Sequence, residues 1–232
     1  MKMYAEIIVE LRRAYDSKAA DRDGVPISPW KAEQRGRFLA ELEREGKTKL
    51  LEIGSGPGRD GKFFRDRGLS VVCTDLSPEM VSFCRGKGLE AYEMDFLHLD
   101  FPAQSFDAVY ALNSLLHVPK ASMRTVLRDI HGLLRRGGLF YMGVYGGEDV
   151  EGPLPEDSYE PKRFFSYYLD HQIIQVVGEV FDLAYFRRIE LARPGRIHFQ
   201  SMILRAKAEP SASGDADPPL PAASARHGKP RR

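Results

Sequence analysis

The stretch Leu50–Phe64, which reads LLEIGSGPGRDGKFF, constrains the fold of this chain more than any other. An apolar run interrupted by Glu52 ends in Gly54, Gly56 and Gly58 and then passes into a helical segment. A strand, a glycine turn and a helix start form a loop whose backbone can lie against a ligand, because glycine has no Cβ. The helix N-terminus adds N–H donors for a carboxylate or phosphate. The loop fits G-x-G-x-x-G, for which a plain tight turn is the alternative reading.

Two amphipathic helices are predicted before this loop. Apolar residues recur at helical spacing in the first, at Tyr4, Ile8, Leu11 and Tyr15. The second begins at Ser28-Pro29, where a capping residue is followed by proline in the first helical position. A plain dinucleotide-binding domain often begins almost directly with its first strand, so these two helices set the chain apart.

Strands and helices alternate after the glycine loop. The predicted strands are Ser70–Thr74, Glu90–Met94, Phe106–Leu112 and Leu139–Val144. Helices are predicted from Ser77-Pro78 onward and over Met123–Leu134. Strands that alternate with helices indicate right-handed βαβ crossovers and a parallel sheet.

The end of the chain has a different pattern. Gly146–Glu160 is a long acidic loop, and Leu169–Val177 is predicted to be a helix. Val180–Leu191 and His198–Arg205 read as two strands joined by a short turn, which must pair antiparallel. Residues 207–232 are rich in Ala, Pro, Ser and Gly, a composition that predicts a disordered tail.

Composition excludes several function classes. A formal net charge of +1 argues against a nucleic-acid partner and against an anionic membrane surface. No apolar stretch reaches the ~20 residues that span a bilayer, and the N-terminus does not resemble a secretory signal. Cys73 and Cys84 are the two cysteines, too few for a disulfide framework. No cluster of acids and histidines has metal-ligand spacing. We therefore expect a cytoplasmic protein without a metal.

Several separate motifs recur along the chain at the ends of the predicted strands: Glu52–Gly58, Asp75, Asp95-Phe96, Ser105–Val109 with Leu116–Val118, and Leu134–Leu139. Together they resemble the motifs of the class I S-adenosylmethionine (SAM)-dependent methyltransferase family, small-molecule type. The resemblance implies an α/β, Rossmann-like three-layer sandwich with a seven-stranded, mostly parallel sheet. Its strand order would be 3-2-1-4-5-7-6, with strand 7 antiparallel. It also implies N-terminal helices (1–46) that cap the cofactor and substrate, a SAM-binding core (47–206) and the tail.

The resemblance assigns a set of residues to the SAM site. These are Tyr15, Glu52, Gly54, Ser55, Gly56, Gly58, Arg59, Asp60, Asp75, Leu76, Asp95, Phe96 and Asn113. Asp75 lies about twenty residues beyond the first glycine, where a carboxylate can accept both ribose hydroxyls, a geometry shared with NAD sites. Asp95 would accept from the adenine amino group between the apolar walls of Phe96 and Leu76; capping of a loop is its alternative role. Glu52 would organise the loop and the methionine end of SAM.

Other assignments leave more than one role open. Arg59 and Asp60 would bind the methionine carboxylate or hold the N-terminal helix over the cofactor, and surface pairing is equally compatible. Asn113 would contact SAM through its backbone carbonyl. Methyl transfer needs chiefly an acceptor aligned with the methyl group, and a general base only where the acceptor must lose a proton. His117 and Tyr15 are the candidate catalytic residues, with Tyr145 a third; packing is the alternative for His117.

We expect a SAM-dependent methyltransferase that transfers a methyl group to an O or N atom of a small-molecule acceptor. The acids of Gly146–Glu160 and the aromatic residues that follow favour an amine acceptor; a solvated loop before a packed aromatic cluster is the alternative. An NAD(P)-dependent oxidoreductase is a rival function, although no Tyr-x-x-x-Lys pair follows the sheet motifs. A non-catalytic SAM-binding module is another.

Overall fold

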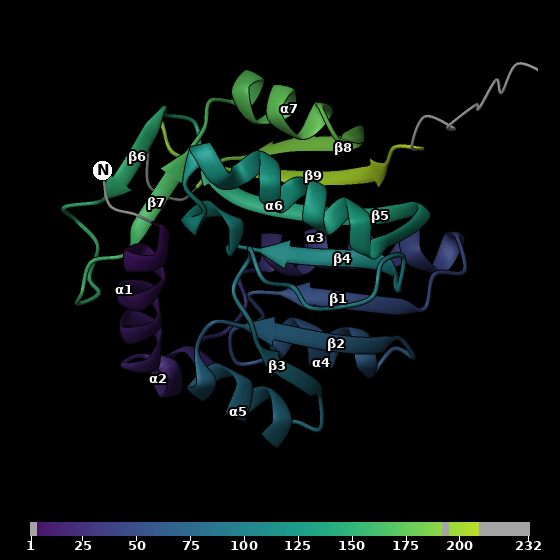
Figure 1. Cartoon of the computed structure of the whole chain (residues 1–232), viewed down its shortest axis with the longest axis horizontal. Helices are drawn as coiled ribbons and strands as arrows, with labels where there is room; N and C mark the ends of the chain where they lie inside the picture. Colours follow the sequence, from purple (N-terminus) through teal and green to yellow (C-terminus); the bar gives the residue numbers. More distant parts are fainter. Residues whose placement is uncertain (1–3, 192–194, 209–232) are drawn as a thin grey trace, which may run out of the picture.

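A seven-stranded sheet forms the centre of the computed structural model, which describes residues 4–191 and 195–208 (Figure 1). Its order is β3-β2-β1-β4-β5-β9-β8. The strands are β1 (Lys49–Ile53), β2 (Ser70–Asp75), β3 (Glu90–Glu93), β4 (Phe106–Leu112), β5 (Leu134–Gly146), β8 (Phe181–Ile189) and β9 (His198–Ala206). β1 to β5 pair in parallel, whereas β9 runs antiparallel to both β5 and β8. The predicted strand order, with an antiparallel last strand, is confirmed.

Helices cover both faces of this sheet. They are α1 (Tyr4–Asp16), α2 (Ala19–Asp23), α3 (Pro29–Arg44), α4 (Arg59–Arg65), α5 (Pro78–Gly86), α6 (Lys120–Leu133) and α7 (Asp170–Gly178). α3, α4 and α5 pack on one face through residues such as Phe38 and Phe64. α6 and α7 pack on the other through Leu127 and Ile173. The central strands are buried on both sides, which explains their nearly continuous apolar sequences.

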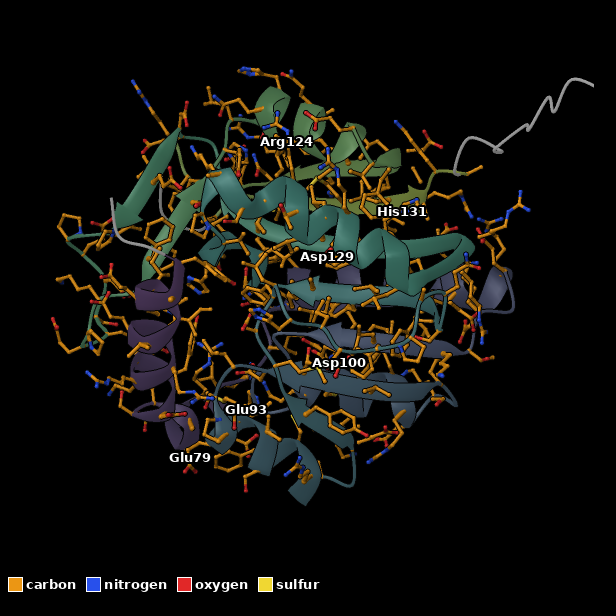
Figure 2. The ribbon with its side chains drawn as sticks, viewed as in Figure 1. Glu79, Glu93, Asp100, Arg124, Asp129 and His131 are labelled. Atoms are coloured by element: carbon orange, nitrogen blue, oxygen red, sulfur yellow. The ribbon has the colours of Figure 1, made fainter. Side chains whose placement is uncertain are left out.

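Polar side chains lie on the outer side of the helices. Figure 2 shows Arg124, Asp129 and His131 along α6, and the first two are exposed. The inner side of the same helix buries Met123, Val126, Leu127, Ile130 and Leu133. This spacing of three and four residues gives α6 one apolar stripe and fixes which side faces the sheet.

α1 and α2 lie across the carboxyl ends of the parallel strands. In Figure 1 the arrowheads of β1, β2 and β4 point toward α1. The Nε of Arg12 on α1 donates to the carbonyl of Leu76, directly after β2 (3.2 Å), and the Arg12 guanidinium also pairs with Glu93 of β3. The N-terminal helices therefore contact the edge of the sheet where ligands of open α/β folds bind. α3, in contrast, contributes to the core itself, and the division at residue 46 stays a prediction.

α2 is a third helix before the glycine loop, where two were predicted, and two stretches after the loop also differ from the predicted elements. Within and after the predicted acidic loop, β6 (Val150–Pro153) pairs antiparallel with β7 (Phe164–Tyr167) in a separate two-stranded sheet. β6 was not predicted, because its glycine, proline and acidic residues are typical of a loop. Its pairing partner, β7, lies beyond the predicted loop. β5 is also longer than the predicted Leu139–Val144: Leu134 already pairs with Phe106 across a register shift.

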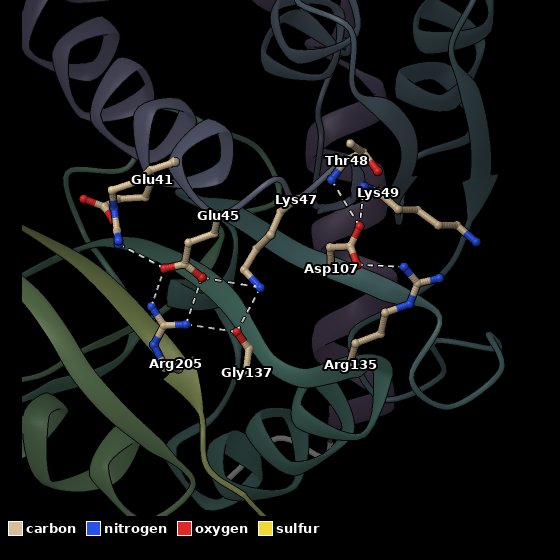
Figure 3. Close-up of polar contacts among 10 residues, drawn as sticks. Glu41, Glu45, Lys47, Thr48, Lys49, Asp107, Arg135, Gly137 and Arg205 are labelled. Carbon is tan, nitrogen blue, oxygen red and sulfur yellow. Dashed lines mark hydrogen bonds and ion pairs between the residues drawn. The ribbon is translucent and has the colours of Figure 1, made fainter.

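Ion pairs and hydrogen bonds tie the opposite, amino ends of the strands together (Figure 3). The Asp107 carboxylate accepts from the backbone N–H of Thr48 (3.1 Å) and Lys49 (2.9 Å) and from Arg135 (2.7 Å). A second group joins the end of α3 to β5 and β9 through Glu45, Lys47, Gly137 and Arg205. These contacts lie at the end of the sheet away from α1 and have a structural role.

Within the described residues, no helix has both the length and the apolar character needed to cross a membrane. Of the predicted tail, only Lys207 and Ala208 belong to the described part of the chain; the rest lies outside it.

Candidate functional site

Two adjoining cavities open at the carboxyl ends of the strands. The inner cavity lies between the glycine loop, the ends of β2 and β4, and α1; its walls include Glu52, Gly56, Asp75, Phe96 and Ser114. The outer cavity, with a volume of about 770 Å³, lies between α1 and the β6–β7 sheet; its walls include Tyr145, Tyr159, Arg163 and Phe165. This volume is in the range typical of small-molecule sites. Residues that line both cavities form their junction: Tyr15, Arg22, Val25, Lys31, Arg59, Asn113 and His117.

The glycine loop has a left-handed backbone at three positions, with φ of +66° at Gly54, +53° at Gly56 and +78° at Gly58. A Cβ on Gly54 would lie 2.3 Å from the Cβ of Ser114, so this glycine allows β1 to approach the turn after β4. A Cβ on Gly56 would meet no atom within 4 Å. Gly56 therefore presents bare backbone to the inner cavity, as a site for a closely approaching ligand requires.

Asp75 ends β2 beside this loop. Its carboxylate accepts from the backbone N–H of Gly56 (2.7 Å) and of Ser77 (3.0 Å). Burial raises the pKa of Asp75, although both N–H groups act in the opposite direction. Each carboxylate oxygen keeps a free lone pair, so Asp75 can accept hydroxyl groups from a ligand while it holds the glycine loop.

Glu52 lies near the carboxyl end of β1, is 3% exposed and lines the inner cavity. The Sγ of Cys73 lies 3.6 Å from its Oε2 and donates to it. Burial, with the nearby Asp60 carboxylate, raises the pKa of Glu52 well above its ordinary range. This shift favours the neutral acid, and a cationic ligand group beside Glu52 would act in the opposite direction.

Arg59 and Asp60 hold the N-terminal segments. Asp60 pairs with Arg35 of α3 (2.6 Å), and the Arg59 guanidinium donates to the carbonyl of Val25 in the segment between α2 and α3. Of the roles that the sequence left open for Arg59 and Asp60, these contacts correspond to holding the N-terminal region in place. Both side chains also line the inner cavity.

Asp95 and Phe96, the pair predicted to border adenine, do not both lie at the inner cavity. Phe96 and Leu76 line the inner cavity, but Asp95 is absent from its walls. The Asp95 carboxylate instead accepts from the N–H of Leu97 (2.8 Å) and contacts the Nδ1 of His98 (2.7 Å). This is the geometry of the loop-capping alternative, because an Asp side chain satisfies N–H groups two residues further along its own turn.

Three buried polar atoms at the inner cavity have no hydrogen-bond partner among the described residues: Arg22 Nε, Asn113 Oδ1 and Ser114 Oγ. Asn113 also has a left-handed backbone, with φ of +55°. Buried polar groups are nearly always paired, so residues with unpaired polar atoms in the wall of a cavity are candidates to bind a polar ligand. Sequence reasoning found Asn113 but missed Ser114 and Arg22.

Tyr15 and His117 are 102 residues apart in the chain and meet at the junction, with 2.5 Å between Tyr15 Oη and His117 Nε2. His117 Nδ1 lies 2.6 Å from the carbonyl oxygen of Phe164. A carbonyl can only accept, so Nδ1 carries the ring proton and Nε2 accepts from the Tyr15 hydroxyl. Burial lowers the pKa of His117 to about 3, which keeps the ring neutral. Arg163 Nη1 lies 3.3 Å from the same Tyr15 oxygen. The third candidate, Tyr145, lines only the outer cavity.

Comparison with known proteins finds a recognised sequence pattern that includes part of the site, from the glycine loop to His117. Residues 51–142 match the family described as "Methyltransferase domain". A tRNA (carboxymethyluridine(34)-5-O)-methyltransferase alkbh8 from Xenopus tropicalis is 28% identical over 139 residues, 60% of this chain and 21% of that protein. A ubiquinone biosynthesis O-methyltransferase from Xanthomonas oryzae pv. oryzae is 30% identical over 145 residues, 54% of this chain and 59% of that protein. The chain thus covers less than two thirds of these relatives.

A solved structure extends the similarity over almost the whole chain. The 1,6-didemethyltoxoflavin-N1-methyltransferase of Burkholderia thailandensis, with bound 1,6-didemethyltoxoflavin and S-adenosylhomocysteine (SAH), superposes with a TM-score of 0.71. The alignment has 22% sequence identity and covers 90% of this chain and 92% of the other. At this identity the comparison shows the shared fold.

Proposed function

The chain belongs to the class I SAM-dependent methyltransferases, and from this premise we propose that it transfers the methyl group of SAM to an oxygen or nitrogen atom of a small molecule. SAM would occupy the inner cavity and the acceptor the outer one. The observation that carries this proposal is the junction, where the two cavities share one set of walls. A methyl group displaced in line must pass between two ligands that meet end to end.

The residues of the inner cavity fit SAM. Asp75 would accept the ribose hydroxyls, and the apolar side chains of Phe96 and Leu76 would flank the adenine. The open Cα of Gly56 and the backbone of Asn113 would contact the methionine part, with Glu52 facing its ammonium group. SAM supplies a methyl group activated by a sulfonium cation. The unpartnered Ser114 Oγ and Arg22 Nε give the site polar contacts that no described residue satisfies.

Tyr15 and His117 would take up the proton that the acceptor loses. The Tyr15 oxygen would receive this proton while its own proton moves to His117 Nε2, which already accepts its hydrogen bond. Transfer of the methyl group also removes the sulfonium charge from the cavity. The loss of a nearby cation favours a protonated imidazole, so the proton acceptor becomes stronger as the reaction proceeds.

Calorimetric titration of SAM, SAH and NADH into the wild type and Asp75→Ala tests the cofactor site. We expect SAM and SAH to bind and NADH not to bind. SAM affinity should be reduced at least about tenfold in Asp75→Ala, because the ribose hydroxyls lose their charged acceptor. Asp129→Ala is the matched control, since Asp129 is exposed on α6 away from both cavities (Figure 2). Binding of NADH in place of SAM would support the oxidoreductase alternative and contradict the proposal.

A further inference from the structure

Every charged side chain at the junction is a cation: Arg22, Lys31 and Arg59 line both cavities, and no acid does so. Their contacts leave much of this charge without an anionic partner. Arg59 donates to a backbone carbonyl, and Arg22 donates to the hydroxyl of Tyr159 (3.2 Å) while its Nε is unpartnered. Buried or half-buried charges are costly unless they are paired.

Lys31 is the clearest case. Its Nζ lies over the rings of Trp30 (5.2 Å) and Tyr145 (5.9 Å) and forms no ion pair or hydrogen bond with any described residue. Burial lowers the pKa of Lys31 to about 8, with Asp60 acting in the opposite direction. A half-buried ammonium group flanked by aromatic rings is thus aimed at the place where the two ligands of the proposed reaction would meet.

Four acids line the outer cavity, and none of them lies at the junction. Asp157 is bound by Arg163 (2.6 Å), and Asp21 pairs with Lys18 (3.2 Å). The other two, Glu148 and Glu156, line the outer cavity only. Asp149, an acid of the loop that favoured an amine acceptor in the sequence, pairs with Lys120. SAM carries one carboxylate together with an ammonium and a sulfonium group, so it would not neutralise the three junction cations.

We propose that the methyl acceptor carries an anionic oxygen group, a carboxylate or an ionised hydroxyl, on an aromatic ring, and that Lys31 binds this anion at the junction. This inference rests on the proposed function and specifies its substrate class. The rings of Tyr145, Tyr159 and Phe165 line the outer cavity and supply flat apolar walls for such an acceptor. Arg22 is a second donor to the same group. The anion is an anchor, separate from the atom that is methylated.

Direct binding tests the proposal without turnover. The SAH-saturated protein is titrated calorimetrically with 4-hydroxybenzoate, 4-hydroxybenzamide and 4-hydroxybenzylamine, which share shape but carry negative, zero and positive charge. We expect the carboxylate to bind at least about tenfold more tightly than the amide, because charge-assisted hydrogen bonds are about twice as strong as neutral ones. A catechol and an acidic nitrophenol in the same panel distinguish an ionised hydroxyl from a carboxylate.

Substitutions assign the preference to one side chain. Lys31→Met keeps the length of the side chain and should reduce the carboxylate-to-amide ratio to below about threefold, whereas Lys31→Arg should retain it. Lys62→Met removes a charge from the exposed face of α4 and controls for net charge. Retention of anion binding in Lys31→Arg assigns the preference to the cation, and an unchanged SAH affinity of Lys31→Met excludes misfolding as the cause of its loss.

Four results would overturn the proposal: no tighter binding of either the carboxylate or the ionised phenol than of the amide, tighter binding of the amine, binding of none of the probes, or an unchanged preference for the anion in Lys31→Met. The last result, if accompanied by a loss of SAH affinity, would assign Lys31 to the cofactor. Failure of methyl transfer with intact anion binding would instead contradict the proposed function and leave this inference standing.

Discussion

The contact between Tyr15 and His117 illustrates how one side chain gains a role from another. Alone, His117 is a buried residue with a lowered pKa, typical of packing. With Phe164 fixing its tautomer, it presents a lone pair to the Tyr15 hydroxyl. Burial raises the pKa of Tyr15, so the hydroxyl keeps its proton at neutral pH and donates it to the imidazole.

Tyr15→Phe removes this hydroxyl and keeps the ring. We expect the rate constant of methyl transfer to fall by about 10²- to 10⁴-fold, the usual contribution of general acid–base catalysis, with SAM affinity changed less than about threefold. The rate is measured by mass spectrometry with SAM that carries a deuterated methyl group, on the acceptor that reacts fastest with the wild type.

Tyr185→Phe is the control for this substitution, because its hydroxyl bonds to Gln34 away from the site (3.1 Å). The double variant Tyr15→Phe/His117→Asn should lose no more activity than the less active of the two single variants, since the two groups act as a unit. Additive losses, or a Tyr15→Phe rate within threefold of the wild type, would contradict the proton-transfer role.

Among the elements, the glycine loop has the most specific conformational demand. Gly56 and Gly46 offer a matched pair: both have a left-handed backbone (φ of +53° and +64°), and a Cβ at either would meet no atom within 4 Å. They differ in place, because Gly56 lines the inner cavity whereas Gly46 follows α3 at the far end of the sheet.

Gly56→Ala and Gly46→Ala should therefore lower the free energy of unfolding by a similar amount, about 1–2 kcal/mol, the cost of a left-handed residue with a Cβ. Only Gly56→Ala should weaken SAM binding, by about tenfold or more, because the new methyl group occupies space where the ligand approaches the backbone. Chemical denaturation and calorimetry measure the two effects. Equal SAM affinity in both variants would show that Gly56 serves only the turn.

Considered as a whole, the molecule separates function and stability between the two ends of its sheet. The carboxyl ends hold cavities with unpartnered polar atoms, whereas the amino ends are held by the network around Asp107 (Figure 3). Burial acts to raise the pKa of Asp107, but the N–H groups of Lys49 and Thr48 and the Arg135 guanidinium together lower it below its ordinary value.

Asp107→Asn should lower the free energy of unfolding at pH 7 by about 1–3 kcal/mol, the range for hydrogen bonds to a charged group. Because the folded-state pKa is lowered, this stabilisation is complete above the unfolded pKa of about 4 and is lost as the pH falls through the folded value. Urea unfolding of the wild type and the variant at pH 7 and near pH 3 measures the difference, which should shrink in acid.

Asp182→Asn, on the exposed part of β8, controls for loss of a carboxylate. SAH affinity should be the same in Asp107→Asn and the wild type, since the network is at the far end of the sheet. A change in SAH affinity, or a destabilisation that persists in acid, would contradict this separation of the two ends.

The sequence by itself determined the alternation of strands and helices, the glycine loop and the place of Asp75 at the end of a strand. Each of these depends on local chemistry: periodic apolar residues, glycines before a helix, and a polar residue at a strand end. The strand order and the cofactor roles of Asp75 and Phe96 were implied by the resemblance to the methyltransferase family. Asp95 shows the limit of such reasoning, because a residue at the expected place after β3 turns its carboxylate to Leu97 and His98.

Only the tertiary structure decided how distant segments meet. Arg22 and Lys31 precede the sheet by many residues, and nothing in their spacing relates them to Asn113 or His117; the one local signal is that Lys31 lies on the inner side of α3 with Gln34 and Phe38. The β6–β7 pairing was hidden for the same reason. Contacts between segments far apart in the chain depend on how α1, α2 and the β6–β7 sheet pack over the strand ends, and this packing leaves no periodic trace in the sequence.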